Sequence, residues 1–560
     1  MSAVSLSVVA VLVLAQVADG GSTGAAPAVT PVPADTDNTA SDVVRSSGLE
    51  GNAAAAAASD AGTSGIAENN SGALTPPPGT PIPGAGTPSM ADDIEGKIAA
   101  ALRLSETLVS WLPVDDQGNY VGPRPFQTRL RVAPEVHFKG FGALAEFDAA
   151  SGAVIGNPPQ AGLLADRVPV PNFQPIELRQ LFLEYRWKSG VFRIGQQTNH
   201  FNLGILANAG NADPQAGDFG QQHFGSFVYR ALLAGRPLFS LGGAWRALEL
   251  YGAGDLVWKD SNADFSIGDR AFQGILGVRF KADDDRYAGV TLIYRRQRAI
   301  GVTDGGRETD AFVVDLGAKW VFFKREDRAL NLGAEVVGIF GTTTQTRTDV
   351  APVSQVRQFG AAAKASYRFR AVTVLFDWGY ASGDQNPYDD RIEGYRFDRD
   401  YKVGLVLFDQ VLGYQSARAG FRAADPNLTG VPPEGVHLLP TGGGVYNAWY
   451  LFPRLKYGFT DWLDLYGGPL FAFSTAKLTD AFSTKVRGGT PHNYLGAQPG
   501  DYLGTELDLG IQARWKPHRL LQITGTIEGG ILLPGDAFRQ ADGTTMGPIG
   551  LGRARLVVAL

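Results

Sequence analysis

Residues 502 to 516 read YLGTELDLGIQARWK, and their side chains alternate in character. The residues of one parity are apolar: Leu503, Leu507, Leu509, Ile511 and Trp515. Those of the other parity are polar or charged: Glu506, Asp508, Gln512, Arg514 and Lys516. Successive side chains of a β-strand point to opposite faces, so this stretch predicts a strand with one apolar and one charged face. The charged face must meet bulk water or line a wet cavity.

The same period of two recurs along the chain, for example in FQTRLRVAPEVHF (126–138) and DAFVVDLGAKWVFF (310–323). Alternating segments of about 10 residues with Trp and Tyr near their ends are typical of transmembrane barrel strands. Closure into a barrel also removes the unpaired edges that a sheet in lipid could not tolerate. We therefore predict an all-β protein, a transmembrane antiparallel up-and-down β-barrel.

The joints between these segments alternate in length. Short joints fall at 139–140, 188–190, 282–285, 323–327, around 370, 458–461 and 516–519. Long joints fall at about 149–177, 199–224, 298–308, 342–354, 383–444, 476–501 and 534–548. Short periplasmic turns and long external loops are typical of bacterial outer-membrane barrels. If both termini are periplasmic, the number of strands must be even, and these segments give a closed barrel of about 18 strands. Residues 401–414 are placed in the long 383–444 joint as a helix or hairpin; an ordinary strand there remains the alternative.

The first 94 residues differ from the rest. SLSVVAVLVLA (5–15) has the length of a signal-peptide core, although no Lys or Arg precedes it, so we predict a signal peptide at 1–18. Residues 19–94 are rich in Gly, Ala and Pro and predict a disordered periplasmic tether. The barrel is expected over 95–560, with 384–443 as a long loop and candidate plug of the lumen. The N-terminus would then be periplasmic and the barrel integral to the bacterial outer membrane.

Composition excludes several classes of function. The chain has 560 residues, no Cys and a formal net charge of −6 without a basic block, so disulfides, thiolate metal sites and nucleic-acid partners are not expected. The six His are scattered, and no zinc-protease, phosphate-loop or nucleophile-elbow motif occurs. We predict no enzyme, no catalytic site, no cofactor and no metal site. A lipase and calcium binding at 283–286 or 386–394 remain as alternatives.

Three segments resemble the alginate-export family of outer-membrane barrels: RQLFLEYRWKSGVFRIGQQ (179–197), LGTELDLGIQARW (503–515) and EGGILLPGDAF (528–538). The resemblance implies an 18-stranded barrel for polysaccharide secretion and a periplasmic polysaccharide-export protein as partner. This chain departs from that family at the turn 516–519, which is too short to serve as the family's periplasmic plug. The chain also ends in Leu560 rather than an aromatic residue.

The polar parity predicts the wall of the lumen. Its candidate path residues are Arg129, Arg131, Arg186, Arg193, Arg279, Arg295, Lys319, Lys364, Arg368, Glu506, Asp508, Arg514, Arg553 and Arg555. Arg forks bind carboxylates and sulfates, so a basic excess favours an anionic or mixed polysaccharide as permeant. The alternative for any single residue is an ion pair that braces the wall.

We therefore predict an export channel for a secreted polysaccharide, with a small-solute porin as the main alternative and a plugged structural barrel as another. The expected partners are the polysaccharide, outer-membrane lipid, the barrel assembly machinery and a periplasmic export protein.

Overall fold

The structure is a computed structural model that describes residues 94–156, 173–241, 243–283, 285–299, 307–346, 351–386, 389–433 and 435–560. The predicted signal peptide and almost all of the predicted tether lie outside these residues. Within the described part of the chain, no helix is both long and apolar enough to cross a membrane.

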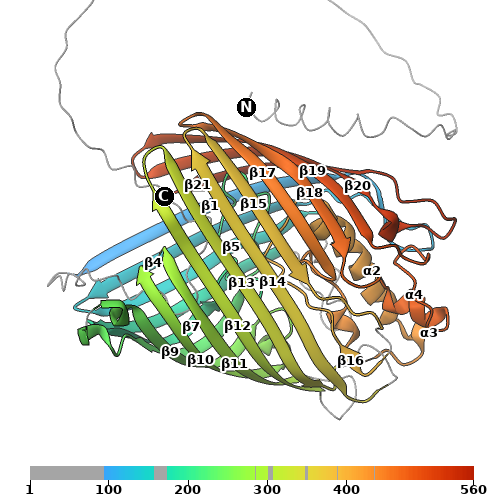
Figure 1. The fold of residues 1–560 in the computed structure, drawn as a ribbon, viewed down its shortest axis with the longest axis horizontal. Helices are drawn as coiled ribbons and strands as arrows, with labels where there is room; N and C mark the ends of the chain where they lie inside the picture. The colour runs from blue at the N-terminus through green and yellow to red at the C-terminus, as the bar shows by residue number, and fades with distance from the viewer. Residues whose placement is uncertain are drawn as a thin grey trace, which may run out of the picture. The chain divides into compact units, whose positions relative to one another are not determined.

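A single closed antiparallel sheet dominates the described chain (Figure 1). Its strands are β1 (Glu95–Val109), β4 (Phe126–Phe138), β5 (Phe141–Ile155), β6 (Phe173–Trp187), β7 (Gly190–Asn199), β8 (Ser226–Gly235), β9 (Leu248–Lys259), β10 (Arg270–Asp283), β11 (Arg286–Ala299), β12 (Arg307–Lys324), β13 (Arg328–Thr343), β14 (Ser354–Phe369), β15 (Val372–Ala381), β17 (Ala448–Thr460), β18 (Leu463–Ser474), β19 (Tyr502–His518), β20 (Leu521–Pro534) and β21 (Ile549–Ala559). The 19-stranded sheet also includes β16 (Arg391–Ile392), which lies parallel to β14. A separate two-stranded sheet joins β2 (Leu112–Pro113) to β3 (Tyr120–Val121).

Each barrel strand pairs with its neighbour in the chain, and β1 closes the ring by pairing with β21. Apart from β16, which is only two residues long, 18 strands make up the barrel. The predicted all-β fold and its 18 strands are confirmed.

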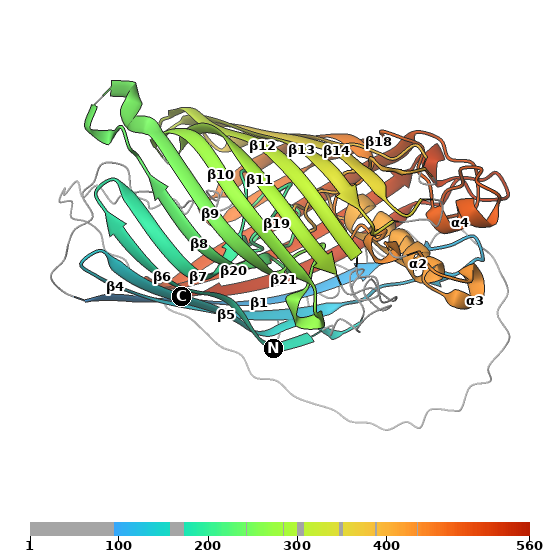
Figure 2. The ribbon, with the colours of Figure 1, turned by 90° about the horizontal axis from the view of Figure 1, so that it is seen from below.

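The two ends of the barrel differ in their connections. One end, called the short-turn end, carries the tight turns after β4, β6, β10, β12, β14, β17 and β19, as predicted, together with the start of β1 and the end of β21. The joint from β8 to β9 lies there too but is longer, with 3-10 turns η1 (Phe239–Leu241) and η2 (Gly243–Ala247). The opposite, long-loop end carries α2 (Gly413–Ala423), α3 (Pro426–Thr429) and α4 (Ala481–Val486), which gather together in Figures 1 and 2.

The faces of the wall reverse the pattern of a globular protein. On β19, Leu507, Leu509 and Ile511 are 45%, 58% and 50% exposed, whereas Glu506 and Asp508 are 0% exposed. Apolar side chains therefore point out of the barrel and carboxylates point in. Aromatic side chains are exposed near both ends, including Tyr185, Trp320, Trp462 and Trp515 near the short turns and Tyr229, Tyr294 and Tyr380 near the long loops. Such belts are typical of the two interfaces of a membrane.

One residue of the opening stretch departs from the predicted parity. Leu503 shares the parity of Leu507 but is 0% exposed. Gly504 has φ of 137°, and the pairing of β18 with β19 shifts register beside it. A bulge of this kind breaks the alternation locally, so Leu503 turns into the packed loops.

Within the segment 401–414, residues 407–414 are helical and no strand forms. It contains the π-helix η4 (Leu407–Leu412), which continues directly into α2. Its apolar residues pack inside the barrel, so the apolar pattern that resembled a strand belongs to a buried loop.

Gly195→Ala tests the tight approach of β7 to β6. Gly195 has φ of 133°, and a Cβ there would lie 2.3 Å from the backbone oxygen of Leu181. A non-glycine residue strained in this way costs about 1–3 kcal/mol, so the free energy of unfolding should fall by at least that amount. The measurement is urea unfolding of the refolded barrel in detergent, with the folded fraction read from heat-modifiable gel mobility.

Gly254→Ala in β9 is the matched control, because a Cβ there would meet no atom within 4 Å. Equal unfolding midpoints for the two variants would contradict the described packing of β6 against β7.

Candidate channel interior

The basic residues predicted to line the lumen mostly form ion pairs. Arg131 donates to Asp148 at 2.7 and 2.8 Å, and Arg193 donates to Glu184 at 2.7 Å. The other basic residues that form an ion pair with a carboxylate are Arg186 with Glu184, Arg279 with Glu249, Arg295 with Asp260, Lys319 with Asp285, Lys364 with Asp377, Arg514 with Asp464, and Arg553 and Arg555 with Glu528. Arg129 pairs with Asp213 and Arg368 donates to the carbonyl of Arg325. Most of these ion pairs join one barrel strand to the next, which fits the bracing role that sequence analysis left as the alternative.

Residues 200–225, between β7 and β8, enter the barrel and are called the first inward loop. Wall residues from distant strands bind it: Arg131 of β4 donates to Gly210 O, Arg454 of β17 to Gly217 O, and Arg553 of β21 to Phe219 O. The loop starts at β7 and ends at β8, and β17 lies nearly opposite these two strands in the ring, so the first inward loop crosses the lumen.

The first inward loop also meets the wall through Asp213. Arg103 and Arg129 both donate to Asp213 Oδ1, at 2.9 and 2.8 Å. Burial opposes ionisation of this carboxyl, yet the charges of Arg129 and Arg103 hold the pKa of Asp213 below its usual value. Burial, with the charge of Arg103, lowers the pKa of His223, so its neutral ring nitrogen can accept from Arg103 at 3.2 Å.

A second wall contact binds backbone rather than side chains. Glu335 of β13 accepts from three successive amides of the first inward loop, Gly204, Ile205 and Leu206, at 2.8, 3.2 and 3.2 Å. Successive N–H groups that converge in this way form a concave site for an anion. We call such an arrangement a carboxylate clamp.

Residues 382–447, between β15 and β17, form the second inward loop and are held by a second clamp. Glu506 of β19 accepts from the amides of Leu405, Val406 and Leu407 at 2.5, 2.8 and 2.7 Å. Asp508 is fully buried beside Glu506, and a hydrogen bond joins the two carboxyl groups. No N–H donor of the described chain binds either oxygen of Asp508. Sequence analysis had suggested that these two acids face an open passage or pair with a wall Arg. In the structure they do neither.

A third clamp joins the two inward loops. Asp400 accepts from the amides of His223, Phe224 and Gly225, at 2.6 to 3.2 Å. Nearby, Asp398 accepts from the amide of Asn208 at 3.1 Å. Burial and then the charge of Asp400 raise the pKa of Asp398 above its usual range. The loops thus form one packed unit inside the wall.

Sequence analysis did not single out Asp398, Asp400, Asp213 or Glu335 as site residues. The first three lie in loops, where no strand alternation marks the inward side. Glu335 has the inward parity, but its ligands are backbone amides, which carry no sequence signature.

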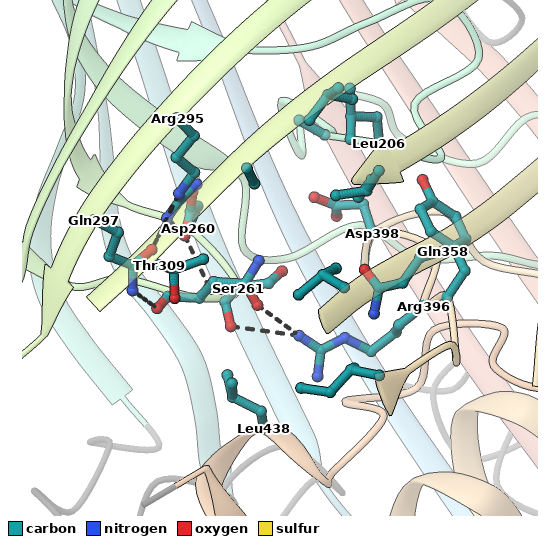
Figure 3. A pocket seen from close by; sticks show the side chains of 18 of the residues that line it. Leu206, Asp260, Ser261, Arg295, Gln297, Thr309, Gln358, Arg396, Asp398 and Leu438 are labelled. Atoms are coloured by element: carbon teal, nitrogen blue, oxygen red, sulfur yellow. Dashed lines mark hydrogen bonds and ion pairs between the residues drawn. The ribbon is translucent and has the colours of Figure 1, made fainter. Parts of the chain in front are cut away.

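A cavity of about 210 Å³ remains between the loops and the wall (Figure 3). The inward faces of β10 to β14 supply one side, through residues such as Arg295, Gln297, Thr309 and Gln358. The inward loops supply the other side, with Leu206, Arg396 and Asp398 among the lining side chains. Residues 260–262 of the β9–β10 joint border it, so the cavity lies toward the long-loop end. No group of three or more His, Asp or Glu side chains in the described residues is arranged to hold a metal ion.

No family model matches the chain, and no curated protein matches it. Solved structures from Pseudomonas aeruginosa are similar in part. The outer-membrane protein OprD matches with a TM-score of 0.44 and 10% identity, over 83% of this chain and 93% of that chain. OccK9 (OpdG) matches with a TM-score of 0.46 and 10% identity, over 83% of this chain and 98% of that chain. The outer-membrane protein OpdK matches with a TM-score of 0.42 and 11% identity, over 83% of this chain and 98% of that chain. The expected membership of the alginate-export family is not supported by these comparisons.

Glu506→Gln tests the clamp on the second inward loop. An amide side chain cannot accept from all three N–H groups, and each hydrogen bond to a charged acceptor contributes about 1.5–3 kcal/mol. We expect trypsin to cleave the folded variant faster after Arg399 or Lys402, which the packed loop now protects. The measurement is the cleavage rate of the detergent-solubilised barrel, with the cut site identified by mass spectrometry.

Glu308→Gln is the control, because Glu308 is an exposed carboxylate on β12. Equal cleavage rates in the two variants would contradict a clamp that holds residues 405–407.

Proposed function

We propose that this protein is an outer-membrane channel for small polar solutes. The observation that carries the proposal is the cavity of about 210 Å³ between the inner wall and the inward loops, toward the long-loop end. Inward loops that narrow a wide barrel to a compact cavity favour passage of single small molecules. Polar rings and constrictions of this kind set selectivity in channels generally.

The membrane setting follows from the exterior. Apolar side chains cover the outward parity and aromatic belts flank it, as in bacterial outer-membrane barrels, whose short turns face the periplasm. By this orientation, which we adopt as part of the proposal, the short-turn end is periplasmic and the cavity lies toward the outside of the cell. Lipid is then the surrounding partner of the wall.

Export of a polysaccharide, which sequence analysis put first, has less support. A polymer needs a continuous path with free basic side chains along it. Among the described residues, the basic path residues bind acids or backbone carbonyls, Glu506 binds loop amides, and the first inward loop crosses the lumen. The small-solute alternative fits these contacts better.

Removal of residues 384–443, replaced by a short Gly-rich link, tests whether the second inward loop narrows the channel. The deletion removes the segment that Glu506 binds, so single-channel conductance in a planar bilayer should rise several-fold. Removal of the exposed tip 541–544 of the β20–β21 loop is the control and should leave conductance unchanged.

Two results would count against the proposal. Unchanged conductance after the deletion would show that the second inward loop does not narrow the path. No current from either the full chain or the deletion variant would contradict a channel.

A further inference from the structure

The charges that line the cavity are compensated within the protein. Four charged side chains line it, two of each sign: Asp260, Arg295, Arg396 and Asp398. Arg295 binds Asp260 through Nη1–Oδ2 at 2.5 Å and Nη2–Oδ1 at 3.3 Å, and its Nε donates to Gln297 Oε1 at 3.0 Å (Figure 3). This pair has no free charge to offer an ion that enters.

The other two charges bind loop groups. Arg396 donates to the carbonyl of Pro440 at 2.6 Å and to Asn262 Oδ1 at 3.3 Å. Asp398 accepts hydrogen bonds from the backbone amides of Asn208 and Asp400, at 3.1 and 2.9 Å. A charged solute would therefore have to break an existing contact to find a partner.

The remaining polar lining is mostly amide. Six amide side chains border the cavity: Asn199, Asn262, Gln273, Gln297, Gln345 and Gln358. Each carries both donors and acceptors, as does a hydroxyl group. The side-chain oxygens of Gln273 and Gln345 are buried and accept no hydrogen bond from the described residues.

Apolar side chains complete the lining and limit its size. Phe201, Ile293, Val313, Ile339 and Tyr395 supply flat or branched apolar surface beside the amides. Sites for drug-sized ligands usually measure about 300–1,000 Å³, so a cavity of about 210 Å³ suits a smaller ligand. A single sugar ring has this size, a rim of hydroxyls and C–H faces.

We propose that the cavity selects an uncharged, polyhydroxylated solute of about one sugar ring and disfavours ions of the same size. The inference rests on the proposed channel function and adds the class of substrate.

The test compares three solutes of one ring size: glucose, glucuronate and glucosamine. The purified full chain is placed in liposomes, and swelling rates report entry of each solute. Glucose should enter fastest, by about fivefold or more over the two ions, because an ion gains no partner in a compensated cavity. Equal rates, or a faster ion, would overturn the inference while leaving the channel intact. No entry of any solute would overturn the channel itself.

Gln358→Glu places a new charge in the cavity. Gln358 borders the cavity from β14 and donates to the carbonyl of Gly394 at 2.7 Å. The variant should raise the rate of glucosamine relative to glucose and lower that of glucuronate. Gln355→Glu is the matched control, since Gln355 is exposed with the opposite parity on the same strand. The same rate ratios in both variants would overturn the inference that this cavity selects the solute.

A second pair of variants separates blocking of the cavity from misfolding of the barrel. Ala311→Phe fills the cavity from β12, whereas Ala288→Phe adds the same atoms to the outer face of β11. With both variants shown to be folded by heat-modifiable mobility, glucose entry should fall only for Ala311→Phe. Unchanged glucose entry in that variant would place the path elsewhere and overturn the inference.

Discussion

The pairing of β1 with β21 is the constraint on which the rest of the structure depends. It runs from Ala101 opposite Ala559 to Val109 opposite Leu551, while β1 pairs with β4 along its other edge. A membrane offers no water to unpaired N–H and C=O groups, and each unpaired group costs several kcal/mol there. Closure removes that cost for the whole sheet. It also commits one parity of every strand to lipid and the other to an enclosed interior.

That enclosed interior is too charged to pack as an ordinary core, so its charges need partners. Ion pairs between neighbouring strands, such as Arg230 with Asp255 at 2.6 and 2.7 Å, supply some of them. The carboxylate clamps of Glu335 and Glu506 supply others by binding backbone amides of the inward loops. The same acids that make the wall polar therefore hold the loops that narrow it. The positions of the inward loops are a consequence of this demand for compensation.

The period of two in the sequence was enough to predict the strands, their number and most turns, because lipid imposes it on every strand. It placed Leu507 and Leu509 outside and Glu506 inside correctly. It failed at Leu503, where the backbone bulge at Gly504 is not visible in a pattern of polarity. Partners of the inward charges could not be predicted either. They depend on loops that return from distant parts of the chain, and a carboxylate clamp binds amides that every non-proline residue has.

Compensation of charge also changes how such a channel can select. In a wall with free charges, a permeant ion is recognised by the sign of its charge; in a wall of ion pairs, it must first displace a partner that is already well placed. An uncharged solute meets no such obstacle, because its hydroxyls can exchange hydrogen bonds with amides without separating opposite charges. Gln297 illustrates the division of roles: it borders the cavity while its oxygen steadies Arg295 and its amide nitrogen binds the carbonyl of Asn262 at 2.7 Å. The ion pairs hold the shape of the interior, and the shape with its amides then decides which solutes fit.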